Sequence, residues 1–158
     1  MPEFTDRELR DALGRFATGV TVVTTEGPDG PLGITANSFA SVSLDPPLVL
    51  WSPARKSRRF PAFEAASHFA VHVLSSGQRH LAERFAGSEQ GFIGLEFERG
   101  IGEVPLLAGC AARLECRHAA GHDGGDHLIV VGEVLRVEET DLPPLVYWRG
   151  GYHEPTLG

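Results

Sequence analysis

The most informative stretch of this chain is GITANSFASVSLDPPLVLW, residues 33–51. Its pattern predicts two β-strands, and any strand must end at Asp45-Pro46-Pro47 because proline cannot donate a hydrogen bond to a strand ladder. The stretch is nevertheless rich in small and hydroxyl-bearing residues, where strands usually have bulky β-branched side chains. The hydroxyl and carboxamide groups belong to Thr35, Asn37, Ser38, Ser41 and Ser43.

This composition suits the close approach of a planar ligand that bears a phosphate. Gly33, Ala36 and Ala40 leave room beside the backbone. Hydroxyl and amide N–H groups can then bind a phosphate without any positive charge. An ordinary polar strand followed by a loop has the same composition, so the residues alone leave both interpretations open.

The flanking sequence predicts more strands than helices. A helix is expected over residues 5–16, where Thr5 and Glu8 form a capping box, and further helices over 57–66, beginning at Ser57, and over 78–85. Strands are expected over residues 20–25, 32–38, 48–51, 68–74, 111–118, 128–138 and 145–148. The segment 86–101 should be irregular, and residues 119–127 should join the two long strands. The predicted fold class is therefore mainly β, a closed or nearly closed antiparallel barrel with two or three peripheral helices.

Length and charge narrow the possible functions. A chain of 158 residues fits one domain, so residues 1–158 are expected to form a single domain. The net charge of −7 argues against binding to nucleic acid. No apolar run is long enough to span a membrane, and the polar N-terminus does not resemble a secretory signal, so a cytoplasmic location is expected.

Cys110 and Cys116 are the only cysteines of the chain. On an extended strand their Cα atoms would lie about 20 Å apart, too far for a disulfide. Two cysteines without a Cys-x-x-Cys pair also make a poor metal site. Both are expected to be packed thiols.

Three further clusters have two interpretations each. Residues 56–59, Lys-Ser-Arg-Arg, are either a phosphate site at a helix start or a solvated basic run. Residues 122–127, His-Asp-Gly-Gly-Asp-His, contain metal-ligating side chains, but the two glycines favour a hairpin turn and no metal is expected. Residues 147–152, Tyr-Trp-Arg-Gly-Gly-Tyr, suit stacking on a planar ligand or an aromatic strand end.

Residues 33–48 resemble the signature Gly-x-Thr-Ala-Asn-Ser-Phe-x-Ser-Val-Ser-x-x-Pro-Pro-Leu of the flavin reductase-like family. The similarity extends from about Leu9 to Tyr152. Members of this family are small FMN- or FAD-binding split β-barrels, often the reductase half of a two-component monooxygenase. The resemblance therefore implies an antiparallel split β-barrel of Greek-key type and a flavin site.

The resemblance also implies which residues bind the flavin. The 33–48 signature, the basic cluster and the LAERFA segment at 81–86 all match family elements that approach the flavin or its phosphate. The expected flavin-binding residues are Thr35, Ala36, Asn37, Ser38, Phe39, Ser41, Val42, Ser52, Pro53, Ala54, Lys56, Ser57, Arg58, Arg84 and Phe85.

Two more motifs point to the nicotinamide side of such a site. Gly125-Asp126-His127 matches the family's Gly-Asp-His, which implies that His127 is the catalytic residue near flavin and nicotinamide, while Asp126 either orients it or shapes the turn. Hydride transfer needs no general base, so His127 would position the nicotinamide and tune the charge near the flavin. Residues 144–152 match a second family motif, which implies that Arg149, Gly150, Gly151 and Tyr152 contact the nicotinamide substrate or the outer edge of the flavin.

The implied activity is an NAD(P)H:flavin oxidoreductase that supplies reduced flavin, by diffusion, to a separate flavin-dependent monooxygenase. The expected cofactors are FMN or FAD, with NADH or NADPH as hydride donor, and the expected assembly is a homodimer. The sequence does not distinguish FMN from FAD, or NADH from NADPH. The alternatives are a flavin-binding protein without turnover, a pyridoxamine-phosphate-oxidase-like flavoenzyme, and a small-ligand module that binds no flavin.

Overall fold

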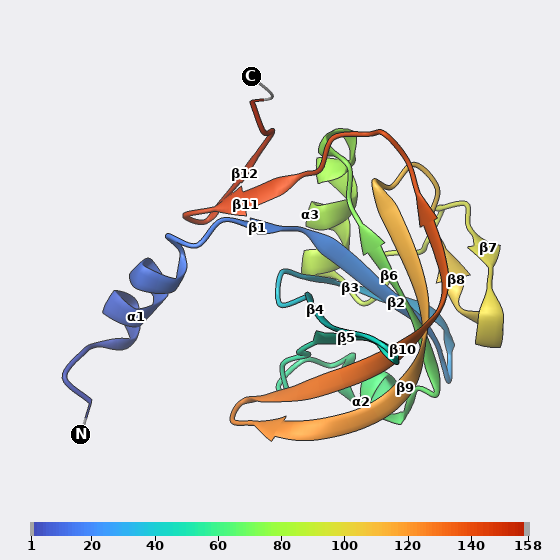
Figure 1. Ribbon diagram of the computed structural model, residues 1–158, viewed down its shortest axis with the longest axis horizontal. Coiled ribbons are helices and arrows are strands. Elements are labelled where there is room, and N and C mark those ends of the chain that lie inside the picture. The colour runs from blue at the N-terminus through green and yellow to red at the C-terminus, as the bar shows by residue number, and fades with distance from the viewer. Residues whose placement is uncertain (1, 157–158) are drawn as a thin grey trace.

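The structure is a computed structural model that describes residues 2–156 (Figure 1). In chain order its helices and strands are α1 (Asp6–Leu13), β1 (Thr18–Gly19), β2 (Thr21–Gly27), β3 (Gly30–Ala36), β4 (Ala40–Leu44), β5 (Pro47–Trp51), α2 (Phe60–Ala65), β6 (His68–Val73), α3 (Arg79–Gly87), β7 (Glu98–Arg99), β8 (Pro105–Leu106), β9 (Ala112–Gly124), β10 (His127–Glu139), β11 (Val146–Trp148) and β12 (Gly151–His153). Two short 3-10 helices, Ser76–Gln78 and Ile101–Glu103, complete the described elements.

A seven-stranded antiparallel sheet with the order β3-β2-β6-β9-β10-β5-β4 forms the body of the protein. Its two edge strands, β3 and β4, are consecutive in the chain and separated only by residues 37–39. That short link keeps the facing strand ends within about 14 Å, so the sheet must roll up on itself. Figure 1 shows this curvature, with β3 and β4 meeting where the sheet is unpaired. The predicted mainly β, antiparallel split barrel with peripheral helices is confirmed.

Two apolar clusters hold the barrel and its helices together. In one, Trp51 packs edge-on against Phe63 of α2, with ring centroids 5.1 Å apart, and also contacts Phe69 of β6. In the other, Phe85 and its neighbours on α3 pack against β2. Cys110 lies in the second cluster and Cys116 in the first, and both are free thiols, as expected.

The long hairpin of β9 and β10 extends further than its sequence suggests. Residues 119–127 were expected to be a joining loop, but β9 continues to Gly124 and pairs with β10 as far as His127. The turn itself needs only Gly125, at φ 73°, and Asp126. The prediction was wrong because glycine and polar residues weaken the strand pattern, whereas pairing with β10 supplies the backbone hydrogen bonds that the segment needs.

The helix ends confirm one prediction and correct another. Thr5 caps α1 and forms the expected capping box with Glu8. The helix expected to begin at Ser57 begins instead at Phe60. The Ser57 hydroxyl accepts a hydrogen bond from the Arg59 N–H, so it closes the turn before α2 and does not cap the helix.

Helix α1 lies apart from the barrel, and none of its residues is buried (Figure 1). Among the described residues, no helix is both long enough and apolar enough to cross a membrane.

Candidate functional site

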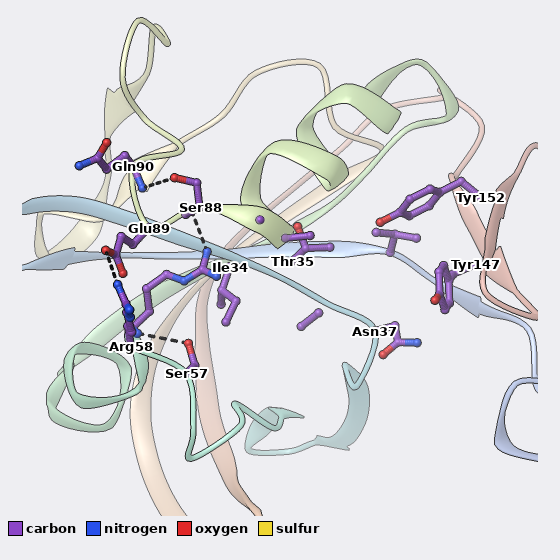
Figure 2. Close-up of a pocket in the computed structure, with 15 residues that line it drawn as sticks. Ile34, Thr35, Asn37, Ser57, Arg58, Ser88, Glu89, Gln90, Tyr147 and Tyr152 are labelled. Atoms are coloured by element: carbon purple, nitrogen blue, oxygen red, sulfur yellow. Dashed lines mark hydrogen bonds and ion pairs between the residues drawn. The ribbon is translucent and has the colours of Figure 1, made fainter. Parts of the chain in front are cut away.

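A pocket of about 850 Å³ lies alongside β3, and we call it the central pocket (Figure 2). A volume of this size is typical of cofactor and small-ligand sites. Four parts of the chain supply its walls: the end of β3 with the adjacent Val20, the turn before α2, the end of α3 with its following loop, and the β11–β12 hairpin. The lining residues are Val20, Ile34, Thr35, Ala36, Asn37, Ser57, Arg58, Arg59, Ala86, Gly87, Ser88, Glu89, Gln90, Tyr147 and Tyr152.

One end of the central pocket is polar and suits a phosphate. The Arg58 guanidinium is 87% exposed and lies 3.8 Å from the Glu89 carboxylate, a loose pair that an incoming anion can replace. The hydroxyls of Ser57 and Ser88 each accept a hydrogen bond from a nearby backbone N–H, at 3.2 and 3.0 Å. Their own hydrogens therefore stay free to donate to a ligand.

Arg59 builds the wall at this end. Its Nη1 donates to the carbonyl oxygens of Gly33, Phe85 and Ser88, at 3.0, 2.7 and 3.0 Å. Burial lowers the pKa of Arg59, and Glu89 opposes that shift. An arginine stays protonated in proteins, so its charge remains beside the polar end while its hydrogen bonds fasten the end of α3 to β3.

The middle of the central pocket is walled by small side chains of β3. The Thr35 hydroxyl donates to the Ala82 carbonyl at 2.7 Å, which ties β3 to α3 and leaves the hydroxyl oxygen able to accept. Ala36 lies beside it, and its methyl group leaves room for a flat ligand. Gly33 does not serve this purpose, because a Cβ there would lie 2.7 Å from the Phe85 ring. The space beside Gly33 is filled by the ring of Phe85, a core residue.

The other end of the central pocket is aromatic. Tyr147 of β11 and Tyr152 of β12 pair edge to face, with ring centroids 5.4 Å apart, and Asn37 lies near them in Figure 2. Burial raises the pKa of Tyr152, so this phenol stays neutral and can donate a hydrogen bond. The rings of the two tyrosines can contact a planar ligand through apolar surface, while their hydroxyl groups can form hydrogen bonds with it.

A second cavity of about 890 Å³ adjoins this aromatic end, because Asn37 and Tyr147 line both. We call it the α1 groove, since α1 and residues 14–16 form one side and Arg149 and Gly150 of the β11–β12 turn form the other. Two hydrogen bonds join these sides: Arg149 N–H to Gly14 O at 2.9 Å and Trp148 Nε1–H to Arg15 O at 3.1 Å.

The α1 groove is positively charged in an acidic protein. Arg10, Arg15 and Arg149 line it, against a single carboxylate, Asp11. Within residues 2–156 none of these three arginines forms an ion pair. The guanidiniums of Arg15 and Arg149 lie 5.9 and 5.5 Å from the ring centre of Trp148, which holds both near the same edge of the groove. Unpaired arginines of this kind suit the phosphates of a dinucleotide.

The structure brings eight of the twenty expected site residues to these two cavities. The central pocket contains Thr35, Ala36, Asn37, Ser57, Arg58 and Tyr152, and the α1 groove contains Arg149 and Gly150. The expected residues that line neither cavity are Ser38, Phe39, Ser41, Val42, Ser52, Pro53, Ala54, Lys56, Arg84, Phe85, His127 and Gly151.

Several of these outlying residues have structural contacts instead. The Ser38 hydroxyl accepts from the Ser52 N–H at 2.9 Å, which joins the link between β3 and β4 to the residue that follows β5. Phe85 is fully buried, so its side chain cannot touch a ligand in this conformation. The Arg84 guanidinium donates to the carbonyls of Gly91 and Ile93 and thereby holds the loop after α3. This position gives the expected phosphate contact of Arg84 no support.

His127 lies at the tip of the β9–β10 hairpin. Its Nδ1 and the Asp126 carboxylate are 2.7 Å apart, which confirms the pairing of these two side chains. The hydrogen bond with His127 lowers the pKa of Asp126. The Arg55 guanidinium donates to Asp123 at 2.8 Å and fastens the loop after β5 to the same hairpin. The catalytic role of His127 stays a prediction. In residues 2–156 no cluster of three or more His, Cys, Asp or Glu is arranged to hold a metal ion.

Sequence reasoning missed part of the site. Residues 86–90, which form the end of α3 and the start of the following loop, line the central pocket, but their composition indicated only an irregular segment. Small residues directly after a helix, Ala86-Gly87-Ser88, were the available signal. Arg10 and Arg15 gave no signal at all, because a surface helix usually has such charges on its solvated face.

Comparison with known proteins agrees with this geometry. A family model described as "Flavin reductase like domain" matches residues 13–156. The protein named FMN reductase (NADH) SmoA, from Agrobacterium fabrum, is 56% identical over 146 residues, which cover 92% of this chain and 84% of that protein. The reductase component of the flavin-dependent trigonelline monooxygenase of Acinetobacter baylyi is 46% identical over 151 residues, which cover 94% of this chain and 49% of that protein.

A solved structure shows the same fold. The NADH:FAD oxidoreductase SgcE6 of Streptomyces globisporus, in complex with NAD and FAD fragments, matches with a TM-score of 0.89 and 38% identity, over 98% of either chain. The chain spans about half the length of some relatives and most of the length of others. The extent of the family match and the identity to these relatives lead to one conclusion. The chain belongs to the family of flavin reductase-like domains.

Proposed function

We propose that this chain is an NADH-dependent flavin reductase that binds FMN or FAD in the central pocket and NADH in the α1 groove. The observation that supports this most strongly is the meeting of the two cavities at Asn37 and Tyr147. A pocket with a phosphate-binding end and an aromatic end thus adjoins a groove lined by unpaired arginines. The named activities of the relatives, FMN reductase (NADH) and NADH:FAD oxidoreductase, agree with this pairing.

The residues of the central pocket fit a flavin. At the polar end, Arg58 and the hydroxyls of Ser57 and Ser88 would hold the phosphate. The small side chain of Ala36 would face the ring system, and Tyr147 and Tyr152 would limit it at the aromatic end. The chain's residues therefore bind and orient the flavin, and none of them needs to act as a base.

The residues of the α1 groove fit a dinucleotide. Arg10, Arg15 and Arg149 would bind its two phosphates, which leaves the nicotinamide to reach the junction at Asn37 and Tyr147. The reaction is NADH + H⁺ + FMN → NAD⁺ + FMNH₂, in which NADH supplies the hydride and the flavin accepts it. The chain contributes by holding donor and acceptor in adjoining cavities, and alignment of this kind accounts for much of the rate of bimolecular steps.

Reduced flavin would then pass by diffusion to a separate monooxygenase. Relatives named as reductase components or subunits of flavin-dependent monooxygenases motivate this step. The substrate of such a partner is not indicated by any residue of this chain.

We also infer that the protein is a homodimer. Helix α1 has no buried residue, and its apolar residues Leu9 and Leu13 are exposed. On the edge strand β4, Val42 is exposed and Leu44 is 96% exposed. Exposed apolar residues on a projecting helix and on an unpaired strand edge favour contact with a second copy of the chain.

A steady-state assay tests the proposed activity. Purified protein is mixed with NADH and either FMN or FAD, and the loss of the nicotinamide absorbance band is followed. Turnover that requires both flavin and NADH is expected, with NADPH as the comparison donor. Flavin binding without NADH oxidation would instead indicate a flavin-binding protein without turnover or a pyridoxamine-phosphate-oxidase-like flavoenzyme. A protein that binds no flavin would contradict the proposal altogether.

A further inference from the structure

The polar end of the central pocket contains a carboxylate, that of Glu89. The charged and hydroxyl groups around it are hydrogen-bond donors, namely the guanidiniums of Arg58 and Arg59 and the hydroxyls of Ser57 and Ser88. Within residues 2–156, Glu89 is the only acidic residue that lines this pocket. An ionised carboxylate accepts hydrogen bonds and donates none, so it cannot hold a phosphate. Glu89 therefore opposes the binding that its neighbours favour.

The backbone on both sides of Glu89 is held at the polar end. The Ser88 carbonyl accepts a hydrogen bond from Arg59 Nη1 at 3.0 Å, and the Gln90 N–H donates to the Ser88 hydroxyl at 3.0 Å. Figure 2 shows Glu89 between these two neighbours, with its carboxylate facing Arg58. The carboxylate thus belongs to the built wall of the pocket.

Glu89 and the proposed flavin phosphate share one partner, the Arg58 guanidinium. Arg58 Nη1 lies 3.8 Å from Glu89 Oε1, and within residues 2–156 neither side chain has another ion pair. Both side chains are exposed, that of Glu89 to 44%, so the pair is weak and either group can turn away from the other. A phosphate that takes Arg58 must displace Glu89, and Glu89 can take Arg58 back when the phosphate leaves.

Glu89 also acts on the phosphate through its charge. At pH 7 a terminal phosphate such as that of FMN has a charge of about −1.5 to −2. A carboxylate at the same end of the pocket repels it, because like charges disfavour each other at short distance. The charge of Glu89 extends to Arg59 as well: burial lowers the pKa of Arg59, and Glu89 opposes that shift. Riboflavin, which has no phosphate, escapes both the competition and the repulsion.

We propose that Glu89 competes with the flavin phosphate for Arg58 and thereby sets how readily the flavin is released. This inference rests on the proposed binding of the flavin in the central pocket, and it goes further by naming a residue whose removal strengthens that binding. A reductase that passes reduced flavin to a separate monooxygenase by diffusion must let the flavin go. A carboxylate that reclaims Arg58 favours this release.

The test compares the dissociation constants of FMN and riboflavin, measured by quenching of flavin fluorescence, in matched variants. Glu89→Gln removes the charge and keeps the size of a partly exposed side chain, whereas Glu89→Asp keeps the charge. The control is Glu64→Gln, which removes the same charge from an exposed residue of α2 that lines neither cavity of the proposed site.

Glu89→Gln should tighten FMN binding about fivefold, the upper range for one charge interaction at an exposed site, while riboflavin binding stays within about twofold of the wild type. The dissociation rate constant of FMN should fall by a similar factor, because changes of affinity within one site lie mostly in dissociation. Glu89→Asp should bind FMN as the wild type does, and Glu64→Gln should change the affinity for neither ligand.

Three results would overturn the proposed competition: unchanged FMN affinity in Glu89→Gln, an equal gain for FMN and riboflavin, or the same gain in Glu89→Asp as in Glu89→Gln. A wild-type protein that binds neither FMN nor riboflavin would instead overturn the proposed function. The two failures are therefore distinguishable.

A double variant measures the contribution of Arg58. Arg58→Gln removes the partner for which Glu89 competes, so adding Glu89→Gln to it should gain less FMN affinity than Glu89→Gln gains in the wild type. The four dissociation constants give the coupling between the two substitutions. An equal gain in both backgrounds would contradict a competition for Arg58.

Discussion

Individual side chains separate the residues that were expected to bind the flavin into two groups. Ser57 and Arg58 line the pocket, whereas Ser41 is exposed on β4 and lines neither cavity of the proposed site. The resemblance to a known family had assigned all three to the flavin. Substitution at these positions therefore tests whether the residues that line the central pocket, and not all residues of the family motifs, bind the flavin.

Ser57→Asp should weaken flavin binding tenfold or more, which corresponds to about 1.4 kcal/mol, because a carboxylate would face the phosphate in place of a hydroxyl donor. The matched control is Ser41→Asp, which makes the same change outside the pocket. Fluorescence titration with FMN gives both dissociation constants. If Ser41→Asp weakens flavin binding as much as Ser57→Asp does, the flavin phosphate does not bind at the polar end of the central pocket.

At the level of elements, the contact between β3 and α3 shapes the pocket wall. The Phe85 ring lies against two glycines: a Cβ would come within 2.7 Å of the ring at Gly33 and within 2.5 Å at Gly91. Phe85 is also fully buried. Close packing of this kind explains a glycine in the middle of a strand, where it otherwise weakens pairing.

Gly33→Ala is accordingly expected to destabilise the protein by about 1–3 kcal/mol through overpacking. Gly77→Ala is the control, because a Cβ at Gly77 meets no atom within 4 Å. Urea unfolding measures both free energies. Equal stability of the two variants would show that α3 does not rest on β3 in this way.

His72 gives the sheet a pH-dependent stability. Its Nδ1–H donates to the Val22 carbonyl at 2.9 Å, and its Nε2 accepts from the Leu107 N–H at 3.0 Å, so the buried ring is neutral. Burial lowers the pKa of His72 from 6.5 to about 4, and the charge of Arg113 adds to the shift. Between these two pKa values the unfolded chain binds a proton that the folded chain does not.

The stabilisation from His72 is therefore fully present above pH 6.5 and is lost as the pH falls toward 4. From this group, the free energy of unfolding should drop by about 2 kcal/mol between pH 7 and pH 5. Urea unfolding of the wild type and of His72→Gln at both pH values isolates the effect. The variant should be less stable at pH 7 but should lose less stability on acidification. Parallel losses in the two proteins would contradict the assignment.

Local sequence patterns predicted the elements that depend on local forces. The β-branched run at 20–25 and the capping box of Thr5 and Glu8 correspond to β2 and α1. Elements that depend on a distant partner were missed or shortened. Strand β1 has only the residues Thr18–Gly19 and exists because it pairs with β11. The tip of β9 exists because β10 lies beside it.

The same distinction explains the candidate site. Thr35, Ala36 and Asn37 were predictable because they lie in one recognisable segment. Residues 86–90, Arg10 and Arg15 join the site only through the tertiary fold: Arg59 holds Ser88 against β3, and the Trp148 indole holds Arg15 near Arg149. The spacing of these residues along the sequence does not predict these contacts.

The exposed apolar residues of helix α1 and of the edge strand β4 are the basis of the proposed homodimer. Light scattering at micromolar concentration should give the mass of two chains for the wild type. Leu44→Asp places a charge at an almost fully exposed apolar residue of β4 and should shift the protein toward the monomer. Ile93→Asp, the same kind of change on another face, should leave the dimer intact. A monomeric wild type would contradict the inferred assembly.

We propose that flavin in the central pocket is reduced by NADH bound in the α1 groove. Anaerobic stopped-flow mixing of the flavin-loaded protein with NADH, followed by the loss of flavin absorbance, tests this claim directly. In the wild type the rate should saturate with NADH. In the double variant Arg15→Gln, Arg149→Gln, half-saturation should need at least tenfold more NADH, about 1.4 kcal/mol, with flavin affinity unchanged. If NADH does not reduce the flavin of the wild-type protein, the proposed reductase activity is contradicted. If the double variant has the same NADH dependence as the wild type, NADH does not bind in the α1 groove.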